Sequence, residues 1–380
     1  MKKSIVFYVC CAVFWIICWI LLKILVFNKH DFENTLLENV WNDWWINNWE
    51  IHILSSIDDE VEDNSMWCGT FQLVWNDMVN EVVKQDVEFN PQPKIVENLN
   101  KQTFTNRELS PSSYYSKFWL LTLNLKKEIE NWIKEKFNES SNLLDQLDWS
   151  NVPKNDGFYR WSPIRRFWFY AMLKKIFKFE NMFDELEAWK FADNYDNIRY
   201  FWINWSSSDL LHDQVYVYYY NSNEDFAVFL KTKEWENVIL ARWASWSSFM
   251  DIYNNILKNR IEYKWNHYFT ENDYLKVPEL SIKTLNEFIE LENKEFPTSN
   301  GTWKIEKALQ TIELKLDKEW WELKSEAWIT YYDEMDDWPM VEPEYRYFYF
   351  DKPYVMFLKE ADKDLPYFAA QISDITLFQN

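Results

Sequence analysis

The stretch TIELKLDKEWWELKSEAWI, Thr311 to Ile329, decides how the rest of this chain is interpreted. From Ile312 to Asp317 apolar and polar residues alternate, which is the pattern of a strand with one buried face. The alternation resumes after the Trp320–Trp321 pair, but the apolar residues then stand at odd instead of even positions. A shift of one residue turns every side chain to the other face, so the stretch predicts a bend or hinge near Glu319 to Glu322.

The composition raises the question of what those tryptophans are. The chain has 25 Trp and 3 Gly in 380 residues, whereas glycine usually makes up about 7% of a protein. Tryptophans also stand where a turn is expected, as in the Asn-rich stretch Asn39 to Trp49 and in Lys233 to Asn237. We therefore hypothesise a bacterial alternative genetic code in which UGA is glycine, so that many of these positions are glycine in the cell. Trp75, Trp132 and Trp149 lie in apolar helical patterns and are expected to be genuine.

Two lysines at the N-terminus precede an almost uninterrupted apolar run, Ile5 to Phe27. We expect residues 1–27 to be a transmembrane anchor or an uncleaved signal, because the run can span a bilayer and no small residues mark a cleavage site. The lysines favour a cytoplasmic N-terminus, which places the rest of the chain outside the cytoplasm. Residues 28–65 are rich in Asn, Asp and Glu and predict a polar tether. A single domain is expected over 66–380.

The formal net charge of −21 argues against nucleic acid as a partner, because there is no basic patch to neutralise phosphates. Three of the four cysteines, at positions 10, 11 and 18, lie in the expected anchor, and Cys68 is the fourth. No disulfide framework is therefore expected within the domain.

The hydrophobic periodicity predicts a helical first half, residues 66–214, and a β-rich second half, 215–380. Helices are expected in the first half over Phe71–Lys84 (with Thr70 as a cap), Leu125–Phe137 and Pro163–Phe177. Three strands of a meander are expected over Val215–Tyr220, Phe226–Lys231 and Val238–Arg242. The remaining elements are a helix over Phe249–Asn259, a strand over Leu275–Ile282 that Pro278 marks as an edge or bulge, a helix over Leu285–Glu292, and strands over Tyr345–Phe350, Tyr354–Lys359 and Tyr367–Ile372.

The order of these elements resembles the second half of a serpin. The motifs that carry the resemblance cover residues 215–380, and we found none in the N-terminal half. They are Val277–Ile282 (VPELSI), Lys304–Ala308 (KIEKA), Asp317–Glu322 (DKEWWE), Phe350–Glu360 (FDKPYVMFLKE) and Leu365–Ile372 (LPYFAAQI).

The resemblance implies an α+β fold with mixed and antiparallel sheets and an exposed loop between a hinge strand and the C-terminal strands. In inhibitory serpins a protease cleaves this loop, which then inserts into a sheet and traps the acyl-enzyme. Here the loop would run from about Glu326 to Tyr345. The hinge would be Glu319, Trp320, Trp321, Glu322, Leu323, Lys324, Ser325, Glu326 and Ala327, and the residues offered for cleavage would be Glu334, Met335, Asp336, Asp337 and Trp338.

The hinge departs from the small residues of inhibitory serpins at Leu323, Lys324 and Glu326. On insertion, the alternation would turn Leu323 and Ser325 inward and leave Lys324 and Glu326 in water, which avoids burying charge. Two readings therefore stay open: an inhibitor of an extracytoplasmic protease, or a non-inhibitory binding protein of the same fold.

An enzyme is the alternative from a different class. Cys68 stands just before the predicted Phe71 helix, where a helix N-terminus lowers a thiol pKa, and His212 or His267 would have to supply the base of a cysteine-dependent hydrolase. The run Ser206–His212 is read as a polar turn, because adjacency in sequence does not make a triad. A surface protein without any catalytic role is a further alternative. No cofactor or metal motif is found, and we expect that the chain is not an enzyme.

Overall fold

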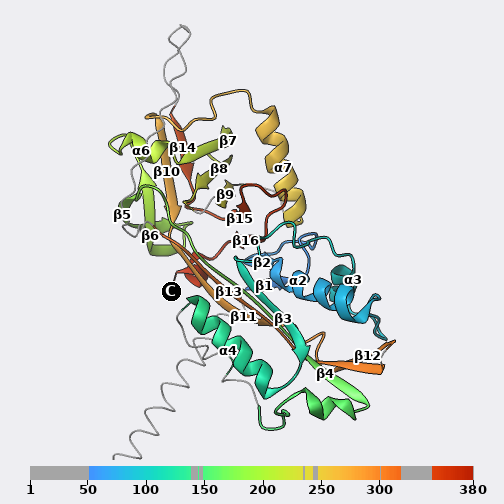
Figure 1. The fold of residues 1–380 in the computed structure, drawn as a ribbon. Coiled ribbons are helices and arrows are strands. Elements are labelled where there is room, and N and C mark those ends of the chain that lie inside the picture. Colours follow the sequence, from blue (N-terminus) through green and yellow to red (C-terminus); the bar gives the residue numbers. More distant parts are fainter. Residues whose placement is uncertain are drawn as a thin grey trace, which may run out of the picture. The chain divides into compact units, whose positions relative to one another are not determined.

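The computed structural model describes residues 51–379, except 138–143, 145–148, 234–235, 243–246, 300 and 318–344. Residues 51–380 form one compact unit. Three β-sheets with helices packed around them make up its fold (Figure 1). The anchor (1–27), the hinge and the residues offered for cleavage all lie outside the described residues. Within the described part, no helix has the length and apolar character that a membrane crossing requires.

The largest sheet has seven strands in the order β1-β2-β16-β15-β9-β8-β7. The predicted meander is confirmed as its β7, β8 and β9, and the two closing strands pair with it as β15 and β16. The strands are β1 (His52–Leu54), β2 (Ser65–Cys68), β7 (Val215–Ser222), β8 (Asp225–Lys231), β9 (Glu236–Arg242), β15 (Tyr354–Glu360) and β16 (Phe368–Ile372).

The four-stranded sheet has the order β14-β10-β6-β5. Its strands are β5 (Asp184–Phe191), β6 (Tyr195–Ile203), β10 (Asp273–Pro278) and β14 (Arg346–Tyr349). The predicted strand at Leu275–Ile282 is in fact two strands, because β10 ends at Pro278 and the chain enters the next sheet at Leu280. Proline has no amide hydrogen to donate, which suits the last residue of a strand.

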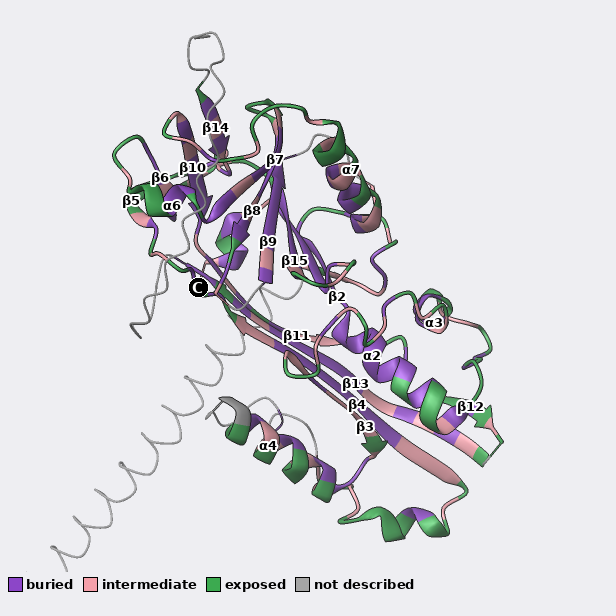
Figure 2. Cartoon of the chain, turned by 45° about the horizontal axis from the view of Figure 1, so that its top comes forward, coloured by how far each residue is buried: buried purple, intermediate pink, exposed green. Residues whose placement is uncertain are grey.

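The third sheet has the order β11-β13-β4-β3, with β12 pairing β13 beside this path. Its strands are β3 (Tyr114–Leu120), β4 (Ile164–Ile176), β11 (Leu280–Glu287), β12 (Lys294–Thr298) and β13 (Gly301–Leu316). The first half of the stretch at Thr311 is thus confirmed as the end of a long strand, and β4 and β13 run through the buried middle of the sheet (Figure 2).

The helices cover the sheets, and the predicted ones at Phe71, Leu125 and Phe249 are confirmed. They are α2 (Thr70–Asp77), which continues as a π-helix (Met78–Val83), α3 (Lys94–Asn100), α4 (Leu123–Phe137), α6 (Asp209–His212) and α7 (Phe249–Glu262), with short 3₁₀ helices at Asp156–Arg160 and Ile375–Phe378. Thr70 does not cap α2, contrary to the prediction: it is the first helical residue, and its Oγ1 accepts a hydrogen bond from Gln310 Nε2 at 2.9 Å.

The predicted helix Pro163–Phe177 is wrong, because this segment is strand β4. Its residues from Phe167 to Leu173 are all buried. Phe167, Phe169 and Ala171 face one hydrophobic core, whereas Trp168, Tyr170 and Met172 face another. A strand covered on both faces shows a continuous apolar run without alternation, so its sequence looks like that of a buried helix. With β3 to β6 all before residue 214, the first half is not mainly helical.

Two further predictions need correction. The predicted helix Leu285–Glu292 is the end of β11 followed by a turn, although the spacing of Leu285, Phe288 and Leu291 resembles a helical repeat. The folded unit also begins before residue 66: β1 pairs with β2 in parallel from His52 onward, and Ser56 and Asn64 are buried. Residues 52–65 therefore belong to the fold, because their backbone and polar groups are paired within it.

Candidate functional site

The feature that distinguishes the third sheet is a parallel pair at its centre. β13 runs parallel to β4 from Thr302 opposite Ile164 to Lys315 opposite Ile176, with a bulge between Ile305 and Lys307. The outer pairs of the same sheet, β11 with β13 and β3 with β4, are antiparallel. We call this central pairing the seam. A new strand that entered the seam and ran antiparallel to both neighbours would make the sheet antiparallel throughout.

Charged side chains bridge the seam on its partly exposed face. The Arg166 guanidinium binds Glu306 through two hydrogen bonds, Nη2 to Oε1 at 2.8 Å and Nε to Oε2 at 3.0 Å. Lys174 Nζ lies 2.9 Å from Glu313 Oε1. Burial would raise the pKa of Glu306, but the hydrogen bonds and charge of Arg166 outweigh it and hold this pKa below its usual range. Both ion pairs would have to separate if the seam opened.

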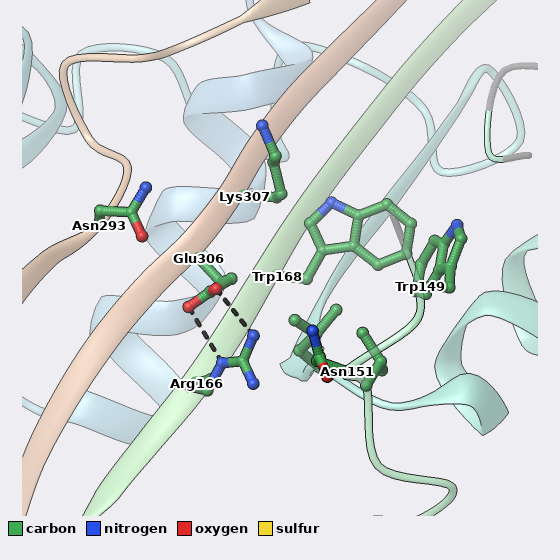
Figure 3. A pocket seen from close by; sticks show the side chains of 9 residues that line it. Trp149, Asn151, Arg166, Trp168, Asn293, Glu306 and Lys307 are labelled. Carbon is green, nitrogen blue, oxygen red and sulfur yellow. Dashed lines mark hydrogen bonds and ion pairs between the residues drawn. The ribbon is translucent and has the colours of Figure 1, made fainter. Parts of the chain in front are cut away.

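A cavity of about 270 Å³ lies over the seam (Figure 3). Arg166 and Trp168 of β4 and Glu306 and Lys307 of β13 line it, together with Trp149 from the connection after α4. The Trp168 indole nitrogen is buried, and no described group accepts a hydrogen bond from it. The side chains of both seam strands thus meet in one cavity over the sheet face, where the connection after α4 does not cover them completely.

The chain leaves β13 at one end of the seam and re-enters the described fold at β14, where Arg346 is held by several hydrogen bonds. The amide of Phe177 donates to Lys315 O at 3.0 Å, and Asp317 is the last described residue before 318–344. The chain returns at Tyr345 and enters β14, which pairs in parallel with β10. Arg346 is buried there and donates to both carboxylate oxygens of Asp273, at 2.8 and 2.7 Å.

The returning arginine has further partners. It also donates to Tyr263 Oη at 3.1 Å and to the backbone oxygens of Asn266 and Tyr268. A buried ion pair is stable only when its remaining donors are satisfied, and here they are. Arg346, just after residues 318–344, is therefore firmly attached to the four-stranded sheet.

The cysteine candidate lies in the core. Cys68 is 4% exposed in β2, and its Sγ is 3.3 Å from Thr70 Oγ1. Burial raises the pKa of this thiol to about 11, the opposite of what a nucleophile needs. Among the described residues, no hydrogen bond joins Cys68 to a histidine: the His212 ring is tilted against that of Phe269, with centroids 5.7 Å apart, and His267 Nδ1 is 2.7 Å from Val217 O.

The serine-rich run before His212 is confirmed as local structure. Ser208 Oγ accepts the amide of Leu210 at the start of α6, and Ser207 Oγ binds Asp184. In the part of the chain that the structure describes, no group of three or more His, Cys, Asp or Glu side chains could hold a metal ion.

The order of the elements after residue 214 follows the resemblance: a meander, a helix, a strand, a long strand, a return strand and two closing strands. It differs at Leu275–Ile282, which was predicted as one strand and forms the end of β10 and the start of β11. The fold is serpin-like. No family model matches the sequence, and no curated relative matches it. The seam itself was not foreseen from sequence, because β4 was assigned as a helix.

The chain is similar to solved serpin structures at low identity. Serpin48 of the insect Tenebrio molitor is 11% identical, with a TM-score of 0.45, covering 81% of this chain and 91% of its own. Serpin-12 of Manduca sexta is 12% identical, with a TM-score of 0.49, covering 82% and 92%. The thermophilic serpin tengpin is 11% identical, with a TM-score of 0.48, covering 84% and 90%. At such identities the likeness concerns the fold alone.

Proposed function

We propose that this chain is a membrane-anchored, extracytoplasmic serpin-like protein that inhibits a protease by inserting the segment after β13 into the seam between β13 and β4. The observation that carries the proposal is the parallel pairing of these two strands at the centre of an otherwise antiparallel path. The anchor and the location follow from the apolar run Ile5 to Phe27.

The length and direction of the segment suit insertion. A segment that turns back after Asp317 runs antiparallel to β13, and hence also to β4. The seam has 13 paired positions on each strand, and residues 318–344 provide enough chain for a turn and a strand of that length. Antiparallel pairing is slightly more stable per residue than parallel pairing, and insertion adds a second set of backbone hydrogen bonds.

In the proposed mechanism the protease supplies the nucleophile and this chain supplies the peptide bond that is cleaved. Its nucleophile attacks a backbone carbonyl within 318–344, the peptide bond breaks, and the amine leaves on the part that remains attached to β14. The carbonyl carbon stays bound to the nucleophile as an acyl group, joined through the rest of the segment to β13. Insertion of that part carries the protease away before water hydrolyses the acyl bond.

The non-inhibitory version of the proposal keeps the fold and the partner but not the insertion. Leu323, Lys324 and Glu326 in the hinge favour it, because they are larger than the residues of fast-inserting hinges. The hydrolase alternative has no support from the structure, since Cys68 is buried and its thiol pKa is raised.

The test is to incubate the full chain with a panel of proteases and look for a complex that survives SDS, together with a large rise in the thermal unfolding temperature of the cleaved chain. Insertion would release strain stored in the native state and give a more stable cleaved chain, so we expect both. Cleavage without either would leave only the binding version.

A pair of hinge variants makes the test specific. Ser325→Glu would place a carboxylate inward on insertion, so we expect cleavage without trapping. Lys324→Glu is the matched control, because residue 324 is expected to face water, and it should trap as the wild type does. Equal trapping by both variants would contradict the predicted orientation.

A further inference from the structure

The outer face of β14 is aromatic although its inner face belongs to the core. Arg346 and Phe348 point inward and are buried. Tyr347 and Tyr349 alternate with them and are only partly buried, and Tyr345, just before the strand, is 52% exposed. Strand alternation therefore brings three tyrosines to one side of the sheet.

A fourth tyrosine from β10 completes a continuous row. Tyr274 stands directly opposite Tyr347 in the register, and their ring centroids are 5.1 Å apart and nearly parallel. The Tyr274 ring also lies 6.3 Å from that of Tyr345, and the Tyr347 ring lies 5.5 Å from that of Tyr349. We call Tyr274, Tyr345, Tyr347 and Tyr349 the tyrosine strip; β10 and β14, which carry it, lie side by side in Figure 1.

The strip carries little net charge along its length. Lys276 Nζ lies 4.2 Å from the Tyr349 ring centroid, at one end, but Asp351 Oδ2 is 3.3 Å away and offsets its charge. Burial raises the pKa of Tyr349 to about 12, so this phenol is neutral at physiological pH. A row of phenol rings offers apolar contact area with hydroxyl groups for hydrogen bonding, which is the composition found at the centre of protein interfaces.

The position of the strip connects it to the segment that a protease would cut. Tyr345 is the first described residue after 318–344, and the ion pair of Arg346 with Asp273 holds the next residue in place. A protein that binds the C-terminal part of this segment therefore arrives beside the strip. Among the described strands, β14 is the edge strand of its sheet.

We propose that the tyrosine strip is a second contact surface for the protease that cleaves within 318–344, and this inference rests on the proposed function. Tyrosine is among the residues that contribute most binding energy at interfaces. The formal net charge of −21 further implies that the matching protease surface is basic beside its apolar contact, because complementary charge speeds association. The tyrosine strip thus determines which protease binds, whereas the segment 318–344 provides the peptide bond that the protease cleaves.

The experiment compares complex formation by the wild-type full chain, the double variant Tyr345→Ser/Tyr349→Ser, and the single variant Tyr345→Ser. Losing two interface tyrosines should lower the second-order rate of SDS-stable complex formation by about tenfold. The number of chains consumed per trapped protease should stay unchanged, because the strip takes no part in insertion. The control is Phe158→Ser, which removes an aromatic side chain that is 62% exposed on the 3₁₀ helix before β4.

Each outcome has a distinct meaning. A slower rate in the tyrosine variants, with unchanged stoichiometry and an unchanged rate in the control, supports the strip. Equal rates in all variants overturn it and leave the proposed function intact. If the wild type traps no protease and binds none of their inactive forms, both proposals fail. Thermal unfolding checks that the variants are folded, and Tyr345→Ser alone, at the exposed position, should still slow the rate.

Discussion

A single buried arginine fixes the point at which the chain returns to the fold after residue 344. Arg346→Leu would leave Asp273, which is 1% exposed, without its counter-charge. Breaking a buried pair from one side costs about 3–5 kcal/mol, so we expect the free energy of unfolding to fall by that amount in chemical denaturation.

The control for this prediction is Lys352→Leu. It removes an ion pair with Glu224 in which both side chains are more than half exposed, and it should cost less than about 1 kcal/mol. Similar losses in the two variants would show that the Arg346 pair does not hold β14 against β10.

The reactivity of the Cys68 thiol distinguishes the serpin-like protein from the alternative of a cysteine-dependent hydrolase. The pKa of Cys68 is raised to about 11, and the side chain is 4% exposed. We therefore expect no alkylation at Cys68 by iodoacetamide at pH 8 in the folded chain and complete alkylation in denaturant, measured by mass spectrometry of the peptide that contains it. Rapid labelling in the folded state would revive the hydrolase alternative.

At the scale of elements, the sequence predicts strands well where they are short and bounded by turns. The meander β7 to β9 and the strands β15 and β16 were placed by alternation or by a short apolar run between turns. β4 was missed because it has 13 residues and both of its faces are buried, in two different cores, so its apolar run has the length of a helix. Since the seam needs β4, the sequence located only its β13 side, by the alternation at Ile312 to Leu316.

A cross-link across the seam tests whether its opening matters. Lys174 and Glu313 are directly opposite in the register, so Lys174→Cys/Glu313→Cys places two thiols within disulfide reach. We expect the oxidised variant to be cleaved by a protease without a gain in thermal stability and without SDS-stable complex, and reduction to restore both.

The matched control joins strands that need not separate. Ser281→Cys/Lys315→Cys links β11 to β13 at another directly opposed pair, so oxidation should leave trapping unaffected. Trapping by the oxidised seam variant would mean that the segment does not enter between β4 and β13.

At the scale of the whole molecule, the seam depends on contacts that no local pattern encodes. Arg166 and Glu306 are 140 residues apart in the chain, yet they form the bidentate pair that closes it. Periodicity reports which face of an element is buried but not which element covers it. The resemblance at residues 215–380 supplied the missing order of strands, which explains why the fold was predicted better than the site.

The tryptophans concern the whole molecule too, and the described ones include two contrasting kinds of position. Trp161, Trp205 and Trp265 stand in turns or bends and are 86%, 75% and 76% exposed. Trp75 is fully buried, and its Nε1 donates to Asn100 Oδ1 at 3.1 Å. None of the described tryptophans has a positive φ, so the backbone at the exposed positions does not require glycine. A glycine there would instead remove an apolar ring from water.

We therefore predict that residues 161, 205 and 265 are glycine in the protein made by its own cells, and that residue 75 is tryptophan. Exposed indole rings in turns contribute no packing, whereas the Trp75 ring fills a core and satisfies Asn100. Peptide mass spectrometry of the native protein distinguishes the two residues at each position, with the Trp75 peptide as the internal control. Tryptophan at all three exposed positions would refute the alternative code, and with it the reading of Trp320 and Trp321 as a slim, flexible hinge.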